Sequence, residues 1–190
     1  MKVTREQILA KAREHFARFG FRKTSLAGIA GELGVVKGAL YYHVPGGKRE
    51  MADACMRAIE DEFYEAMRRA SDDERDPANA LRAAIRAKLT VIAGLRERIG
   101  LSEQVGEEIK VMMASQEREY HDREVHLFEK ILAWGEREGE FRSFASREAV
   151  ARVIQAIVRH FELADAFAGS EDERTGELTL ELILGGLRAR

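Results

Sequence analysis

Residues 24–48 read TSLAGIAGELGVVKGALYYHVPGGK. A Thr-Ser pair, typical of a helix cap, precedes apolar residues that recur at helical spacing up to position 33. Gly34 tolerates the positive φ of a tight turn, and a second short helix is expected over residues 36–44. Pro45-Gly46-Gly47 then breaks the chain. Two short helices joined by a glycine turn predict a helix-turn-helix.

A third helix precedes this stretch. Thr4 and Gln7 have the spacing of a capping box, and apolar residues follow at helical spacing until Gly20, which is expected to end the helix. We expect the three helices to share one core, with Val35 and Leu40 filling its centre. Many helical proteins have a glycine turn between short helices, so this pattern alone also allows an ordinary helical bundle.

Three polar aromatic residues, Tyr41, Tyr42 and His43, follow Leu40 directly. If Leu40 faces the core, part of this cluster must point outward. Phenol and imidazole groups donate to phosphate oxygens, and Lys48, at the start of the next helix, can pair with another phosphate. The alternative is that one tyrosine packs in the core and His43 only ends a helix. A clamp on the DNA backbone explains all four residues together.

Charge is distributed unevenly along the chain. The net charge of the 190 residues is −2, but residues 1–50 hold ten Lys or Arg and four Asp or Glu, which gives +6. The remaining residues hold 21 and 29, which gives −8. A basic head on an acidic body indicates a polyanion-binding head, although chance clustering on a solvated helix would give the same numbers.

These residues carry a family resemblance. The pattern over residues 4–55 closely resembles the amino-terminal DNA-binding signature of the tetracycline-repressor (TetR) family, whereas the rest of the chain is similar only in layout. The resemblance implies a homodimeric, all-helical transcriptional regulator, usually a repressor that a small molecule releases from a palindromic operator. It also implies the roles of particular residues. Phosphates would be held by Thr24 or Ser25, Tyr41, His43 and Lys48, and base edges would be faced by Ala27, Lys37, Gly38 and Ala39.

Two positions depart from the family pattern. The family commonly has Ser or Thr where Val36 stands, and loss of such a helix cap costs about 1 kcal/mol; it often has Phe where Val44 stands. Among the base-facing residues, Lys37 alone has a side chain that hydrogen-bonds bases, most naturally guanine O6 and N7. We therefore expect sequence reading by Lys37, by apolar contacts from Val36 or Ala39 to thymine methyl groups, and by DNA shape.

The rest of the chain predicts further helices, because long stretches rich in Ala, Leu, Glu and Arg run between only two prolines. Asp76-Pro77 is a strong helix start. The expected helices span residues 48–70, 77–98, 107–115, 116–138, 146–168 and 175–188. We expect an all-α fold, in which a helix-turn-helix DNA-binding domain over residues 1–47 is joined by the helix from residue 48 to a ligand-binding and dimerisation domain over residues 48–190.

The last two expected helices are apolar on more than one face. Beside its large apolar residues, helix 146–168 carries a second stripe of mostly small residues: Ala149, Val153, Ala156, His160 and Ala164. Gly185 and Gly186 allow close approach of another helix. We expect helices 146–168 and 175–188 to form a four-helix dimer interface with their copies, the alternative being that both lie deep in the core of one subunit.

A ligand pocket is expected among helices 77–98, 107–138 and 146–168, because methionines and aromatic residues suit an adaptable apolar cavity. Each of its candidate lining residues has an ordinary core position as the alternative. These residues are Ile85, Leu89, Ile92, Met112, Met113, Tyr120, Phe128, Trp134 and Phe161.

Other features of the sequence limit the possible classes of function. Asp122 and His126 share a helix face beside His121, but no third ligand stands at a known spacing, so no metal is expected. Cys55 is expected to be a packing residue, with a redox switch as the alternative. We find no nucleophile, phosphate-loop or zinc motif, and expect neither an enzyme nor a cofactor.

The single cysteine, the lack of a membrane-length apolar run and the lack of a signal-peptide pattern predict a cytoplasmic protein. A partner-binding or structural helical protein is the rival to a DNA-binding regulator. It leaves the basic head and the cluster of phosphate donors unexplained.

Overall fold

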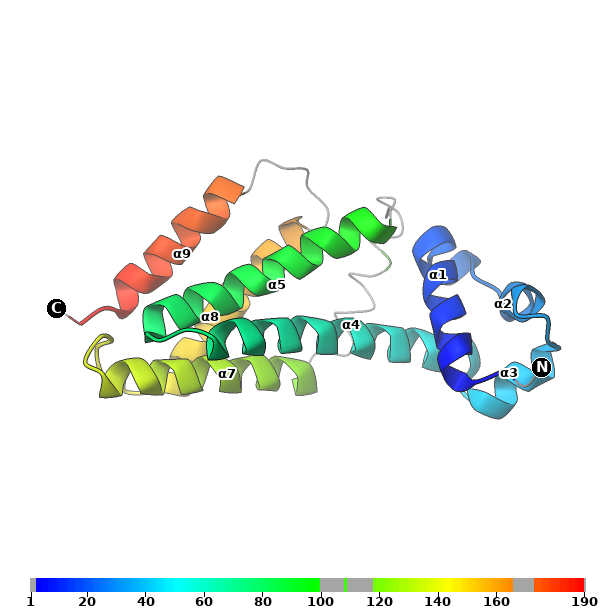
Figure 1. Ribbon diagram of the computed structural model, residues 1–190, viewed down its shortest axis with the longest axis horizontal. Coiled ribbons are helices and arrows are strands. Elements are labelled where there is room, and N and C mark those ends of the chain that lie inside the picture. The colour runs from blue at the N-terminus through cyan, green and yellow to red at the C-terminus, as the bar shows by residue number, and fades with distance from the viewer. Residues whose placement is uncertain (1–2, 100–107, 109–117, 166–172, 190) are drawn as a thin grey trace. The chain divides into compact units, whose positions relative to one another are not determined.

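The computed structural model describes residues 3–99, 108, 118–165 and 173–189. Within these ranges every regular element is a helix, so the predicted all-α fold is confirmed (Figure 1). The helices are α1 (Arg5–Lys23), α2 (Leu26–Glu32), α3 (Lys37–His43), α4 (Gly47–Asp72), α5 (Pro77–Ile99), α7 (Arg118–Arg137), α8 (Arg147–Asp165) and α9 (Glu173–Leu187). Most of the expected helix 107–115 lies outside the described residues.

The chain divides into two compact units. The first contains α1, α2, α3 and the part of α4 up to Asp61, and the second contains the rest of α4 from Glu62, α5 up to Gly94, α7, α8 and α9. Among the described residues, no helix is both long and apolar enough to cross a lipid bilayer.

The caps of the first unit follow local sequence rules. Thr4 and Gln7 form the predicted capping box, in which the Gln7 N–H donates to Thr4 Oγ1 at 3.3 Å and the Thr4 N–H donates to Gln7 Oε1 at 2.9 Å. Gly20 has a φ of 76° and a non-helical backbone, so the regular helix is interrupted there as predicted; one further short helical segment, which ends at Lys23, follows the kink and is included in α1. Ser25 Oγ accepts the Gly28 N–H at 3.0 Å and caps α2.

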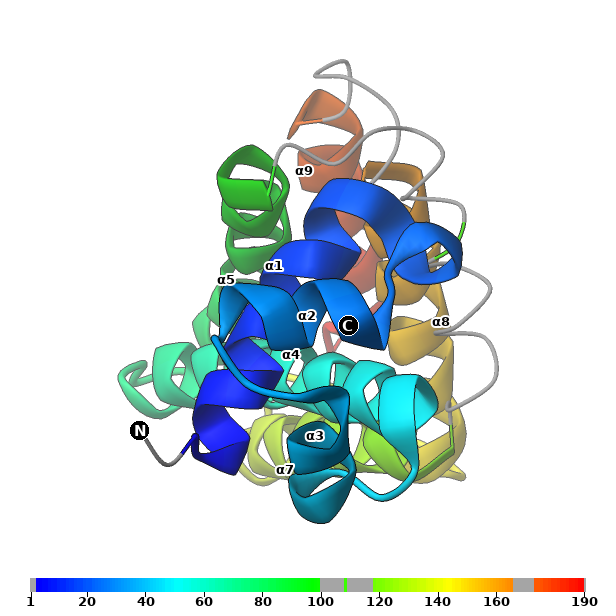
Figure 2. The same cartoon turned by 90° about the vertical axis from the view of Figure 1, so that its right-hand side faces the viewer.

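The first unit closes around a small apolar core. Leu40 on α3 is fully buried, as predicted, whereas Val35 is only partly buried. The buried members of this core are Val3, Ile8, Ala12, Ile29, Ala30, Leu40, Val44, Met51 and Cys55. Figure 2 shows α1, α2 and α3 facing the viewer. Burial of Cys55 raises the pKa of its thiol to about 11, which suits the predicted packing role and leaves the sulfur a poor nucleophile at neutral pH.

The second unit has the larger core, to which α4, α5, α7, α8 and α9 all contribute. Asp76 Oδ1 accepts the Asn79 N–H at 2.8 Å, so α5 starts at Pro77 as predicted. Ser146 Oγ accepts the Ala149 N–H at 3.1 Å at the start of α8. The turn after α7 pairs with the end of α9 and the residues after it, since the Arg142 N–H donates to the Leu187 carbonyl at 2.9 Å and the Ala189 N–H donates to the Glu140 carbonyl at 3.0 Å. This pairing ties the end of α9 to the turn between α7 and α8.

Candidate nucleic-acid interface

The turn between α2 and α3 sets the direction of α3. Gly34 adopts a φ of 66°, which favours glycine, and the Val35 N–H donates to the Ala30 carbonyl at 3.0 Å. Leu40 then anchors α3 in the core with no exposed surface. The opposite face of the same helix must therefore lie at the surface.

The residues expected to meet base edges lie mostly at the surface. Val36, Lys37 and Gly38 are exposed, Val36 to 76 %, and Ala39 is half-buried. Val36 makes no side-chain hydrogen bond to the first turn of α3, as expected for a residue without a hydroxyl. Ala27 on α2 is also exposed.

The Tyr-Tyr-His cluster lies at the carboxyl end of α3. Tyr42 is 81 % exposed and Tyr41 is 44 % exposed, so neither tyrosine is a core residue. The rings of Tyr42 and His43 meet edge to face with centroids 5.1 Å apart, and Lys37 Nζ lies 5.8 Å from the centre of the Tyr41 ring. Tyr41 thus lies beside Lys37, and Tyr42 lies beside His43.

The paired residues Thr24 and Ser25 differ sharply in environment. The Thr24 side chain is 3 % exposed, and its hydroxyl donates to the carbonyls of Gly20 at 2.7 Å and His15 at 3.1 Å. Ser25 is exposed and caps α2. Between these two alternatives, only Ser25 offers a hydroxyl at the surface.

Lys48 is engaged within the protein. Its ammonium group donates to the carbonyls of Phe21 at 2.9 Å and Thr24 at 3.1 Å and lies 3.4 Å from the carbonyl of Arg22. It also lies 4.6 Å from the centre of the Phe21 ring. Sequence reasoning missed these partners because they lie more than 20 positions away along the chain.

An ionic cluster joins α1 to the end of α2. His15 Nε2 lies 2.9 Å from Glu32 Oε1 without hydrogen-bond geometry, and Lys11 Nζ lies 3.5 Å from Glu32 Oε2. Desolvation raises the pKa of Glu32, but the neighbouring His15 and Lys11 outweigh it and hold that pKa below its ordinary value of 4.5. The cluster was not recognised in the sequence, where an isolated histidine on a helix gives no signal.

The expected ligand-pocket residues fall into three groups. Ile85, Ile92 and Phe128 are buried, and Leu89 and Trp134 are partly buried against the same core. The side chains of Met112, Met113, Tyr120 and Phe161 lie outside the described residues. Ile85 and Leu89 line a cavity of about 10 Å³ with residues of α8 and α9. This volume is close to that of one water-sized probe, so as described the cavity cannot hold a small organic molecule.

The Asp122–His126 pair makes protein contacts. His126 Nδ1 lies 2.6 Å from the Asp122 carbonyl, and Asp122 Oδ1 accepts from Arg152 at 3.2 Å. The described part of the chain holds no group of three or more His, Cys, Asp or Glu side chains placed to bind a metal ion.

An apolar strip of α8 and α9 is exposed. On α8, Val153 is 58 % exposed and lies between the exposed residues Ala149 and Ala156, with His160 one turn further. On α9, Leu178 is 54 % exposed and Leu182 is 77 % exposed, and Gly185 and Gly186 follow on the surface. The alternative that this second stripe lies inside one subunit's core was therefore wrong for these residues. The side chain of Ala164 lies outside the described residues.

The amino-terminal sequence matches a known family. Residues 8–55 match the sequence profile of a family described as bacterial regulatory proteins, tetR family. Over these residues the chain carries the amino-terminal region of that family. Its helix-turn-helix and its helical body are those of tetR-family regulators, and such regulators bind DNA operators as dimers and respond to small-molecule effectors.

The chain is also similar to named transcriptional regulators. The chain is 32 % identical over 83 residues to the HTH-type transcriptional regulator LmrA of Bacillus subtilis, and this match covers 44 % of each protein. It is 24 % identical over 192 residues to the HTH-type transcriptional repressor KstR2 of Mycobacterium tuberculosis, which covers 96 % of this chain and 92 % of KstR2. The solved structure of that KstR2 superposes with a TM-score of 0.61 at 25 % identity, over 98 % of this chain and 95 % of KstR2.

Proposed function

We propose that this chain is a transcriptional repressor that binds a palindromic operator as a homodimer and leaves it when a small molecule binds. The surface of α3 carries this proposal, because Lys37, Tyr41 and Tyr42 are exposed there and His43 is half-buried beside Tyr42. A phosphate-rich duplex explains why such groups are exposed together. The relatives LmrA and KstR2, which are a transcriptional regulator and a transcriptional repressor by name, support the same function.

The proposed DNA contacts divide by role. Lys37, Gly38 and Ala39, with Val36 and Ala27 beside them, would face base edges in the major groove. Phosphate oxygens would accept from the hydroxyls of Ser25, Tyr41 and Tyr42 and from the His43 ring. The buried Thr24 hydroxyl already donates to two carbonyls, so we do not include it.

The proposed dimer forms through the exposed strip of α8 and α9. Val153, Leu178 and Leu182 are large apolar side chains that are each more than half exposed in the single chain. Burial of both copies in a four-helix contact removes that surface from water. A two-fold dimer also presents two copies of α3, which must lie about 34 Å apart to read successive major grooves.

The proposed effector is a largely apolar small molecule that binds among α5, α7 and α8. Support comes from the apolar side chains of Ile85, Leu89 and Phe128 at the centre of this unit. Because the described cavity is too small, the effector must bind an expanded arrangement of the second unit. We propose a domain boundary at residues 47 and 48, with α4 carrying that change to the DNA-binding head.

Two rival functions make different predictions. The named relatives are transcriptional regulators, not enzymes, which argues against an enzyme. A partner-binding helical protein without specific DNA binding would show neither a preferred DNA site nor a steep dependence of DNA affinity on salt. A cytoplasmic location accompanies the proposed function.

The experiment that tests the proposal selects preferred sites from a pool of random duplex DNA at near-physiological salt. We expect enrichment of a palindrome whose half-sites are about one helical turn apart or a multiple of it. A folded protein that enriches no sequence, and whose weak DNA binding is equal for all duplexes, would contradict the proposal.

A further inference from the structure

The ammonium group of Lys48 lies at a helix end that lacks hydrogen-bond partners of its own. The last carbonyls of an α-helix have no partner within the helix. Phe21 and Arg22 belong to the last turn of α1, and Thr24 is the residue that caps it. Lys48 reaches all three carbonyls from the first turn of α4. The cation therefore closes the carboxyl end of α1 from another helix.

The donors of Lys48 are occupied by these contacts. An ammonium group has three N–H donors and no acceptor. Two of them meet carbonyls at 2.9 and 3.1 Å, and the third acceptor lies at 3.4 Å. The Phe21 ring covers the group at 4.6 Å. A phosphate oxygen could accept a hydrogen bond from Lys48 only by displacing one of these partners.

Thr24, whose carbonyl accepts from Lys48, directly precedes the DNA-facing Ser25 in the chain. The Thr24 carbonyl bonded to Lys48 is joined by a peptide bond to Ser25, which caps α2. Thr24 is fixed from its other side, because its N–H and its hydroxyl both donate to the Gly20 carbonyl. Thr24 is held on both sides and cannot absorb a shift of the start of α4 by itself. Such a shift must therefore also move Ser25 and the start of α2.

We propose that Lys48 is a positioning residue that ties the start of α4 to the α1–α2 connection and so sets the placement of α2 and α3, rather than a contact to phosphate. The inference rests on the proposed DNA-binding function. It identifies Lys48 as the contact through which a movement of α4 would reach α2 and α3. Loss of the tie would keep the same DNA-facing side chains but allow α2 and α3, which carry them, to change position.

DNA affinity and its salt dependence distinguish a positioning role of Lys48 from a direct contact to phosphate. The test uses the full-length protein, the duplex selected by the wild-type protein and a random duplex of equal length. For Lys48→Met, we expect selected-site affinity to fall by about tenfold or more, as loss of bonds to a charged donor implies. Random-duplex affinity and the slope of log K against log salt should stay close to wild type. A phosphate contact would instead weaken both duplexes equally and lower the magnitude of the slope by about 1.8, because the proposed dimer carries two copies of Lys48 and each phosphate contact contributes about 0.9.

Two further variants test whether the loss of a positive charge alone explains the effect of Lys48→Met. Lys48→Arg keeps the charge but replaces the compact ammonium by a planar fork, so it should lose selected-site affinity as Lys48→Met does; retained affinity would overturn the proposal. Arg49→Met removes the neighbouring charge, whose side chain is 62 % exposed and pairs with Asp53, and should leave the preference for the selected site unchanged.

A direct measurement needs no variant and covers the case in which Lys48→Met fails to fold. In the wild-type complex, the Lys48 ammonium nitrogen should show NMR couplings across hydrogen bonds to the carbonyl carbons of Phe21 and Thr24. Couplings to phosphorus in their place would overturn the inference. A wild-type protein that selects no site removes the proposed function itself, whereas normal site selection with phosphorus couplings removes only the role of Lys48.

Discussion

The ammonium group of Lys88 on α5 lies 2.6 Å from the carboxylate of Glu124 on α7, and the two side chains are 1 % and 0 % exposed. Gln155 on α8 donates to the second Glu124 oxygen at 3.4 Å. One carboxylate therefore joins three helices inside the second unit. Because both charges are out of water, each depends on the other for its solvation.

Removal of one partner should be costly. We expect Lys88→Met to lower the free energy of unfolding by about 3–5 kcal/mol, since it leaves Glu124 buried without its cation. The double variant Lys88→Met/Glu124→Leu should recover most of that loss, because the interior then holds no unpaired charge. Urea unfolding at fixed protein concentration measures both variants.

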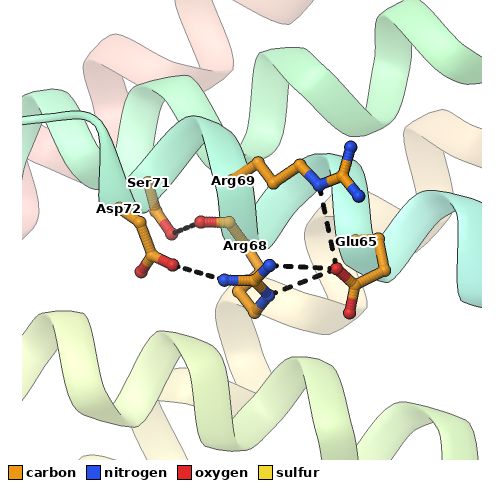
Figure 3. Close-up of polar contacts among 5 residues, drawn as sticks. All are labelled: Glu65, Arg68, Arg69, Ser71 and Asp72. Atoms are coloured by element: carbon orange, nitrogen blue, oxygen red, sulfur yellow. Dashed lines mark hydrogen bonds and ion pairs between the residues drawn. The ribbon is translucent and has the colours of Figure 1, made fainter.

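An exposed pair provides the control. Arg68 on α4 lies between Glu65 and Asp72, with N–O distances of 3.1 and 2.6 Å and a side chain that is 41 % exposed (Figure 3). Arg68→Met removes the same charge but should cost far less stability than Lys88→Met, because water solvates the remaining carboxylates. Equal losses for Lys88→Met and Arg68→Met would show that burial is not what makes the Lys88 pair matter.

A second prediction concerns Gly135 near the end of α7. A side-chain carbon at this position would overlap the ring of Phe141, which is 2 % exposed. We expect Gly135→Ala to destabilise the protein by about 1–3 kcal/mol, as overpacking does, despite the better helix propensity of alanine.

Gly94→Ala on α5 is the matched control for Gly135→Ala. Apart from the adjacent residues and the nearby backbone of its own helix, no described atom lies within 4 Å of the carbon that it adds, so it should stabilise the protein by up to about 1 kcal/mol. Thermal unfolding compares the two variants, and the same sign for both would contradict the packing argument.

Local sequence rules predicted the elements well. The Thr4 capping box, the Gly34 turn and the Asp76 helix start each depend on residues within four positions of one another, so a short stretch of sequence contains all the information they need. Gly20 shows where such rules end. Its positive φ was predictable, but the return of the chain to a helix up to Lys23 depends on what the next residues contact.

The details of the candidate interface depend on long-range contacts. Sequence alone left Thr24 and Ser25 as equivalent hydroxyls, and only the fold directs one to the carbonyls of His15 and Gly20. The partners of Lys48 lie 24 to 27 positions away, and Lys88 and Glu124 are 36 positions apart. No periodicity in the sequence connects residues at such separations.

A third prediction concerns sequence reading by Lys37. If Lys37 bonds guanine O6 and N7, Lys37→Ala should weaken binding to the selected duplex by about 1–3 kcal/mol and relax the preference at that base pair. Competition binding against duplexes with that guanine replaced completes a double-mutant cycle. Equal weakening of selected and random duplexes would make Lys37 a phosphate contact and reject its role in base reading.

A fourth prediction concerns the exposed strip on α9. Leu182 is 77 % exposed in the single chain, so Leu182→Glu should leave the fold of one chain intact but place two like charges close together in the proposed dimer. We expect sedimentation to show dimers for the wild type and monomers for the variant. Thr90→Glu, at an exposed position on α5, should remain dimeric. Dimeric Leu182→Glu would place the interface elsewhere.

The last prediction concerns Glu32 and pH. His15 and Lys11 hold the pKa of Glu32 below 4.5 in the folded chain. A carboxylate whose pKa is lowered by folding contributes stability above its unfolded pKa and loses that contribution as the pH falls through its folded pKa. We therefore expect Glu32→Gln to be less stable than wild type at pH 7, with a difference that shrinks as the pH falls below 4.5.

Urea unfolding between pH 7 and pH 3.5 measures the effect, and an NMR titration of the Glu32 carboxyl carbon checks the pKa directly. Glu138→Gln, which replaces an exposed carboxylate just beyond α7, corrects for the loss of one negative charge elsewhere on the chain. A difference between Glu32→Gln and wild type that stays constant over this range would mean that the ionisation of Glu32 does not help to hold α1 and α2 together.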